Sequence, residues 1–165
     1  MSQQANFIAK AQGEVGTKEN PPNSNNTKYG EFTGKNGLPW CGSFVMWCAN
    51  QVGLKMPSVV YTPAGVIGFQ GIGAWANPQT STPQPGFIAF FDFPGGKATD
   101  HVGIVIKDNG DGTVTTVEGN TIPDGKTGNE ANGGEVCLKI RAYRKDNKRK
   151  LTPFITGFGK PKFKD

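Results

Sequence analysis

A loop is predicted to turn directly into a helix in the segment Gly37-Leu38-Pro39-Trp40-Cys41-Gly42-Ser43-Phe44-Val45-Met46-Trp47-Cys48. Pro39 disfavours helical geometry at the residue before it, so the helix should not extend upstream of Cys41. The apolar residues that follow recur at helical spacing and Gly53 is a typical helix stop, which predicts a buried helix over residues 41–52. Cys41 therefore lies in the first turn of this helix.

Cys41 has the position of a nucleophile. A cysteine attacks a carbonyl as thiolate, and a free cysteine forms little thiolate at neutral pH. A helix N-terminus offers about half a positive charge and unpaired N–H groups, which favour the anion. The N–H of Cys41 can also point at a developing oxyanion. The competing interpretation is an ordinary buried thiol, like Cys48.

The chain has one histidine, His101, which opens a predicted strand over residues 101–106 after the loop of residues 95–100. Near neutral pH only this side chain can act as a general base without an unusual pKa shift. A lone strand histidine is often structural, but a strand end can project its side chain into a cleft. A cysteine at a helix start and a histidine on a later strand are the two halves of a papain-type thiol hydrolase.

A side chain that orients the imidazole is expected on the following strand. The hairpin turn Asp108–Gly112 should return the chain as a strand over residues 113–118. Antiparallel pairing then brings Glu118 and Asn120 to the level of His101. These two residues project to the same side while the chain stays extended, so either can orient the imidazole. The alternative for Glu118 is a surface glutamate at a strand end.

The order of the predicted elements gives the fold class. Helices come first and an antiparallel meander of strands follows, which indicates an α+β domain. The chain of 165 residues buries one core and is too short for two, so we expect one domain over residues 1–165. The predicted helices cover residues 3–13, 41–52 and 62–69, with a long polar loop over residues 17–38. The predicted strands cover residues 87–91, 101–106, 113–118, 136–143 and 154–158.

Charge is distributed unevenly along the chain. Residues 139–165 contain ten Lys and Arg against two Asp, a net charge of +8, whereas residues 1–138 carry −3. This basic C-terminal region is either a solvated hairpin and tail or a surface attracted to polyanions. It lacks the aromatic platform and the motifs of nucleic-acid-binding proteins, so a phosphate-rich cell wall is a stronger candidate than nucleic acid.

The three cysteines fit neither a disulfide scaffold nor a zinc site. Cys41 and Cys48 are seven residues apart, and the short paired spacings of zinc ligands are missing. Cys48 and Cys137 lie among apolar neighbours and are interpreted as small buried hydrophobes. We therefore predict no metal site. The sequence shows no transmembrane segment and no signal peptide, so we expect no membrane insertion.

Three motifs together resemble one family. The segments Leu38–Trp47, His101–Val105 and Val117–Thr121 are similar, in order and spacing, to the CHAP domain of bacteriophage endolysins and bacterial cell-wall hydrolases. This module is a cysteine, histidine-dependent amidohydrolase/peptidase. The resemblance extends from the first predicted helix through the last strand. It implies a single CHAP catalytic domain with a papain-like fold, in which N-terminal helices pack on an antiparallel sheet.

The resemblance also implies roles for particular residues. Related NlpC-type peptidases place a tyrosine about a dozen residues before the cysteine, where it lines the oxyanion site, and Tyr29 stands there. Trp40 is expected to line the cleft, while Trp75 and Phe93 fit either the cleft or the core. The implied catalytic set is Cys41, His101, Glu118 and Asn120.

The implied function is hydrolysis of an amide bond in Gram-positive peptidoglycan. An N-acetylmuramoyl-L-alanine amidase and a peptide endopeptidase would use the same residues, so the bond stays open. One alternative is a catalytically inactive module that binds the cell wall or a polyanion, and another is a papain-fold thiol enzyme acting on non-wall amides. We expect a monomer that is made in the host cytoplasm and reaches the wall through holin pores, or that is virion-associated.

Two departures from the family pattern bear on partners. Some CHAP lysins bind calcium through an acidic Asp-x-Asp cluster near the nucleophile, but the corresponding loop, Asn23–Lys28, has no carboxylate. This composition argues against calcium, and no other cofactor is implied. Lysins often carry a separate wall-binding domain, and none follows residues 139–165. Either this basic region attracts anionic wall polymers, or the catalytic module has been cut from a longer protein.

Overall fold

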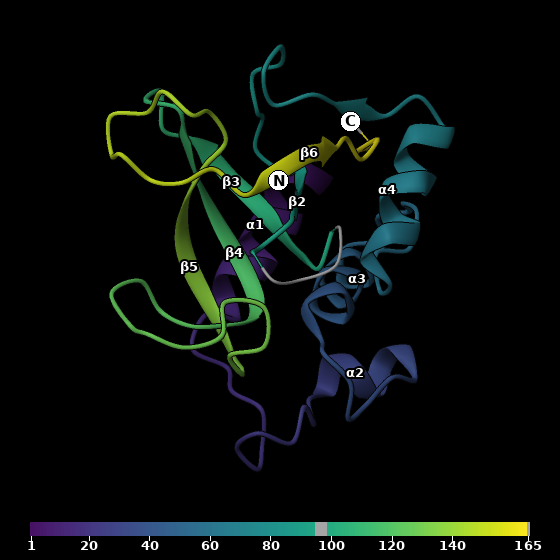
Figure 1. Cartoon of the computed structure of the whole chain (residues 1–165). Coiled ribbons are helices and arrows are strands. Elements are labelled where there is room, and N and C mark those ends of the chain that lie inside the picture. Colours follow the sequence, from purple (N-terminus) through teal and green to yellow (C-terminus); the bar gives the residue numbers. More distant parts are fainter. Residues whose placement is uncertain (95–98, 165) are drawn as a thin grey trace.

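A computed structural model of the protein describes residues 1–94 and 99–164, and in this part of the chain it contains four helices and one six-stranded sheet (Figure 1). The helices are α1 (Gln3–Gly13), α2 (Lys28–Thr33), α3 (Cys41–Gln51) and α4 (Thr62–Gly71). The strands are β1 (Trp75–Ala76), β2 (Ile88–Phe91), β3 (His101–Asp108), β4 (Thr113–Thr121), β5 (Glu135–Ala142) and β6 (Ile155–Gly159). The predicted α+β class is confirmed. Part of the predicted loop, residues 95–98, lies outside the described residues.

The helices form where the local sequence predicts them, with one exception. Ser2 caps α1 by accepting a hydrogen bond from the N–H of Ala5. The cap position of α4 is Tyr61, and the hydroxyl of Thr62, the first residue of the helix, donates to the carbonyl of Thr99. This contact ties the start of α4 to the segment just before β3. No helix in the described ranges has the length and apolar character needed to span a bilayer.

α2 was not predicted, because it lies inside the polar segment assigned as a loop. It has only six residues and therefore shows no apolar period. Local capping defines it instead. The hydroxyl of Thr27 accepts from the N–H of Gly30 at the start, and Gly34 adopts a left-handed conformation at the end.

The sheet has the order β1-β6-β2-β3-β4-β5, and the neighbouring strands are antiparallel. The predicted meander is therefore correct for β2 to β5. The last strand, β6, returns to the opposite side of β2 and pairs with both β1 and β2. Helices α2, α3 and α4 lie together beside the sheet, and α1 passes behind it (Figure 1).

The two faces of the sheet bury different sets of side chains. Val102, Ile104 and Val117 belong to the core shared with the helices, whereas Val105 and Val114 belong to a second core on the other face. Because side chains alternate along a strand, His101 and Glu118 point to the second face.

Close contact between α3 and β4 depends on a glycine. A Cβ added at Gly119 would lie 2.6 Å from Cβ of Phe44, so only a glycine lets the helix approach this strand. The approach brings the N-terminal end of α3 toward the beginning of β3.

Candidate active site

Cys41 is the first residue of α3, as the sequence predicts. The preceding residue, Trp40, makes no side-chain capping hydrogen bond, so the first N–H groups of the helix keep their positive potential. A Cβ at Gly42 would lie 2.0 Å from the carbonyl oxygen of Val59, so the loop before α4 packs directly on the first turn. Cys41 is 5% exposed. The residue is thus nearly enclosed but keeps a small exposed area.

His101 is the first residue of β3 and is fully buried. Its Nε2 lies 2.8 Å from Oε1 of Glu118. Its Nδ1 makes no hydrogen bond to any residue in the described ranges, although Cys41 is close enough to perturb the pKa of the ring. Since Nε2 is taken by Glu118, we infer that Nδ1 is the nitrogen that faces the thiol.

The charge state of His101 follows from these neighbours. Burial lowers the pKa of the imidazole, but its interaction with Cys41 and its hydrogen bond and ion pair with Glu118 outweigh burial and raise it to about 9. The ring therefore carries its second proton at neutral pH. An imidazolium beside a thiol stabilises the thiolate and holds a proton ready for a leaving group.

Glu118 is fully buried and accepts four hydrogen bonds. Besides His101, the donors are the hydroxyl of Thr116 at 2.5 Å, Nε of Arg141 at 2.9 Å and Nη2 of Arg141 at 2.6 Å. Burial alone would raise the pKa of this carboxyl group, but Arg141 and then His101 hold it well below its usual range. Glu118 is therefore ionised.

The side chain of Glu118 reaches His101 by passing over Gly103. A Cβ at Gly103 would lie 2.5 Å from Cγ of Glu118, closer than side-chain carbons approach one another. A glycine at position 103 therefore leaves the space that the side chain of Glu118 needs to reach His101.

Asn120 does not reach His101, which corrects one of the two predictions for the orienting residue. Its φ of +58° and the register shift after Glu118 end the strand alternation assumed from the sequence. The side chain turns toward the β4–β5 loop, where Nδ2 donates to Asn132 and Oδ1 accepts from the N–H of Gly134. Asn120 therefore anchors this loop.

Tyr29 and Trp40 are core residues, so their predicted places at the oxyanion site and in the cleft are wrong. Both are fully buried and their rings stack at 5.5 Å. The hydroxyl of Tyr29 donates to Glu14, and Nε1 of Trp40 donates to Glu19. With their polar atoms bonded inside the fold, neither ring is available to a substrate.

The other two aromatic candidates separate clearly. Trp75 packs on Phe90 in the helix-side core. Phe93 lies against the ring of His101 with centroids 5.7 Å apart, and it lines a groove with Pro94, Asp100, residues 128–132 and Phe154. This groove begins next to the buried pair and is a candidate path for a substrate.

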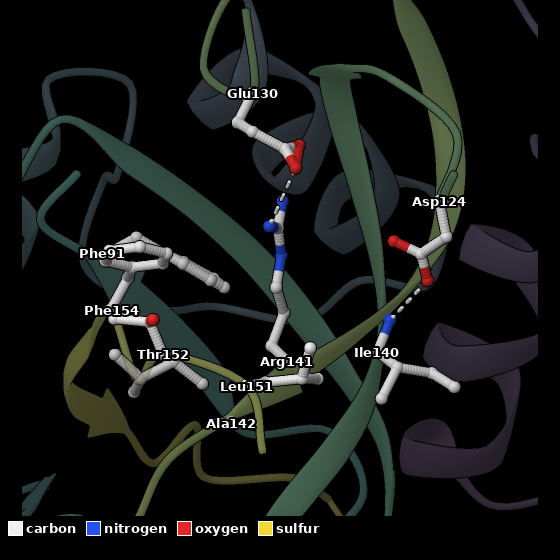
Figure 2. A pocket seen from close by; sticks show the side chains of 10 residues that line it. Phe91, Asp124, Glu130, Ile140, Arg141, Ala142, Leu151, Thr152 and Phe154 are labelled. Carbon is white, nitrogen blue, oxygen red and sulfur yellow. Dashed lines mark hydrogen bonds and ion pairs between the residues drawn. The ribbon is translucent and has the colours of Figure 1, made fainter. Parts of the chain in front are cut away.

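Sequence reasoning missed Arg141, which it counted as part of a basic surface. Arg141 is buried on β5, and so is Lys139, which pairs with Asp124 and Glu130. The two cations therefore do not contribute to a polyanion-binding surface. The sequence did contain a signal for this burial. Lys139 and Arg141 are two residues apart in a largely apolar strand, so both side chains point to the same face of the sheet. Figure 2 shows Arg141 extending between the strands toward Glu130.

Over residues 1–94 and 99–164, no three His, Cys, Asp or Glu residues lie in an arrangement that could hold an ion.

Comparison with known proteins gives the family. The CHAP domain model matches residues 33–120, more than half of the chain, and this segment contains Cys41, His101, Glu118 and Asn120. The chain belongs to the CHAP family. No curated protein sequence matches it.

Solved structures share the fold of this CHAP chain. The crystal structure of Ly7917 has a TM-score of 0.53 and 14% identity, and the crystal structure of Ly7917 with the hydrolyzing product of MDP has a TM-score of 0.52 and 11% identity. In both comparisons 96% of this chain covers 62% of the other. The chain thus spans less than two thirds of Ly7917. An NLP/P60-family protein of Staphylococcus aureus is also similar, with a TM-score of 0.47 and 11% identity, over 96% of this chain and 41% of that one.

The first prediction concerns thiol reactivity in the CHAP chain. Iodoacetamide should modify Cys41 at least about tenfold faster than Cys48 or Cys137, because only Cys41 lies beside an imidazolium at a helix start. Burial raises the pKa of Cys48 well above its usual range, and burial with the charge of Glu135 raises that of Cys137 to about 12. Mass spectrometry of tryptic peptides measures the three rates. Equal rates in the folded protein would contradict the assignment.

The second prediction concerns stability and pH. The pKa of His101 is raised from 6.5 to about 9 on folding, so its contribution is complete below pH 6.5 and is lost as pH rises through 9. We expect the contribution of His101 to the free energy of unfolding to decrease across this window. Urea denaturation at pH 6 and pH 9.5 measures the change. In Cys41→Ala the decrease should begin at lower pH, and a flat profile in the unmodified protein would contradict the linkage.

Proposed function

We propose that this CHAP chain is a peptidoglycan hydrolase that cleaves an amide bond with Cys41 as its nucleophile. The observation that carries the proposal is that the imidazole of His101, whose Nε2 lies 2.8 Å from Oε1 of Glu118, also interacts with Cys41. Support for the substrate comes from Ly7917, which shares the fold and has a structure with the hydrolysing product of MDP, a muramyl dipeptide.

The first half of the reaction forms a thioester. The Cys41 thiolate attacks the amide carbonyl carbon, and the negative charge moves to the carbonyl oxygen. The N–H of Cys41 and the N-terminal end of α3 stabilise this oxyanion. The imidazolium of His101 then gives its Nδ1 proton to the leaving nitrogen as the carbon–nitrogen bond breaks. The amine departs, and the acyl group stays on Cys41.

The second half returns the enzyme to its starting state. With the thiolate charge gone, His101 is a neutral base whose Nδ1 can accept a proton from water. The resulting hydroxide attacks the thioester carbonyl, and the carbon–sulfur bond breaks to release the carboxylic acid. Glu118 accepts from Nε2 throughout, which keeps Nδ1 directed at the reacting atoms.

The bond that is cut is either the N-acetylmuramoyl-L-alanine amide or a peptide bond of the stem or cross-bridge. Both are unactivated amides and need the same three groups. The exposed lysines of the C-terminal region, away from Lys139 and Arg141, would favour approach to anionic wall polymers. We place the enzyme's action at the Gram-positive wall, reached by the lysis pathway of a phage or from the virion.

The third prediction tests this function directly. Purified protein should lower the turbidity of Gram-positive cell walls and release new amino or carboxyl groups. Cys41→Ala should reduce the rate by about 10³-fold or more, because the covalent route is lost. Cys48→Ala is the matched control, since it removes a buried thiol from the same helix two turns away and should retain hydrolysis.

Three outcomes decide between the candidate functions. Mass spectrometry of the released fragments identifies the bond when hydrolysis depends on Cys41. Binding to walls without hydrolysis, equal for the native protein and Cys41→Ala, would replace the proposal by an inactive binding module. If the walls stay intact but another amide is hydrolysed, the protein is a thiol enzyme whose substrate is not the cell wall.

A further inference from the structure

Arg141 forms a buried bidentate ion pair with Glu118. Its Nε donates to Oε2 at 2.9 Å and its Nη2 donates to Oε1 at 2.6 Å, the same oxygen that receives Nε2 of His101. The guanidinium lies over the rings of Phe91 and Phe93 at 5.2 and 5.3 Å. Those two rings also flank His101, so they enclose the three polar groups together.

Burial makes the total charge of this cluster important. A buried charge without a partner is costly, and such a site takes up or releases a proton to become neutral. Arg141 carries one positive charge and Glu118 one negative charge, so these two balance. The remaining pair, Cys41 and His101, is then neutral when it holds a single shared proton as thiolate and imidazolium.

We propose that Arg141 is a positioning and charge-balancing residue of the active site, which fixes Glu118 under His101 and permits the thiolate–imidazolium pair at neutral pH. Without its charge the cluster of Cys41, His101 and Glu118 has one negative charge in excess. Burial then favours uptake of one more proton, and the thiolate is lost. The inference rests on the proposed function only in that this pair is the one that reacts.

The charged groups Glu130 and Asp100 near the cluster have other bonding partners. Glu130 approaches Arg141 at 3.4 Å but is also bonded to Lys139. Asp100, next to His101, accepts from the N–H of Phe93. Among the described residues Cys137 also interacts with Glu118, and its raised pKa keeps it neutral. Arg141 is therefore the cation that offsets Glu118. It lies outside residues 33–120, which the family model matches.

The fourth prediction uses the pH dependence of Cys41 alkylation, which needs no cell-wall substrate. In Arg141→Gln the midpoint of the iodoacetamide rate should move at least about one pH unit to the alkaline side, so that at a pH below the native midpoint the rate should be about tenfold lower. The midpoint for His101, read from its single imidazole by ¹⁵N NMR, should move in the same direction. Loosened packing alone would hydrate the ring and move its midpoint down toward 6.5.

A double variant separates charge balance from packing. Glu118→Gln with Arg141→Gln removes both charges, so the alkylation midpoint should return to within about half a unit of the native one. Lys139→Met is the matched control. It removes a buried cation from the same face of β5, but this cation pairs with Asp124 and Glu130 rather than with Glu118. Its midpoint should stay native.

Each outcome has a defined meaning. An unchanged alkylation midpoint in folded Arg141→Gln would overturn the proposal, and so would an equal shift in Lys139→Met. If Arg141→Gln does not fold, the double variant is the test of the proposal. A folded double variant whose Cys41 is no longer alkylated at neutral pH would contradict charge balance. If the alkylation shifts occur but the native protein leaves walls intact, the proposed function fails while the role of Arg141 stands.

Discussion

The carboxylate of Glu118, buried and ionised in the middle of the sheet, is the group around which the active site is organised. It receives hydrogen bonds from His101 on β3, Thr116 on β4 and Arg141 on β5, so one side chain joins three adjacent strands. A buried carboxylate is tolerated only when it is fully paired, and here all four donors are present. The orientation of the imidazole follows from this arrangement.

The fold separates the parts of the site by their exposure. His101 and Glu118 are fully buried, while Cys41 keeps a small opening to the surface. In such a dry environment the interactions among the thiol, the imidazole and the carboxylate are stronger than they would be in water. The groove beside Phe93 is bordered by the β4–β5 loop, which Asn120 and Lys139 hold from the inside. Packing in the core therefore holds the imidazole and the carboxylate in place. A loop anchored by polar contacts borders the groove through which we expect a substrate to reach them.

Local patterns were sufficient to predict most of this architecture. The helix start at Cys41, the strand of His101 and the hairpin that returns Glu118 each depend on residues close together in sequence, and all three are found in the structure. The failures arose where a distant contact decides the outcome. Asn120 turns away because of a bulge, and Tyr29 and Trp40 bond to acidic partners from the N-terminal segment. Arg141 looked like surface charge until pairing of β4 with β5 placed it beside Glu118.

The central claim is that Cys41 forms a covalent bond with the substrate, driven by His101. The most direct measurement is rapid acid quenching of the protein during hydrolysis of purified muropeptides, followed by mass spectrometry of the peptide that contains Cys41. We expect an added acyl group on Cys41 that matches the acid half of the cleaved amide, and none when His101 is replaced by Ala. Hydrolysis that proceeds in Cys41→Ala, or an acyl group located on another residue, would contradict the account.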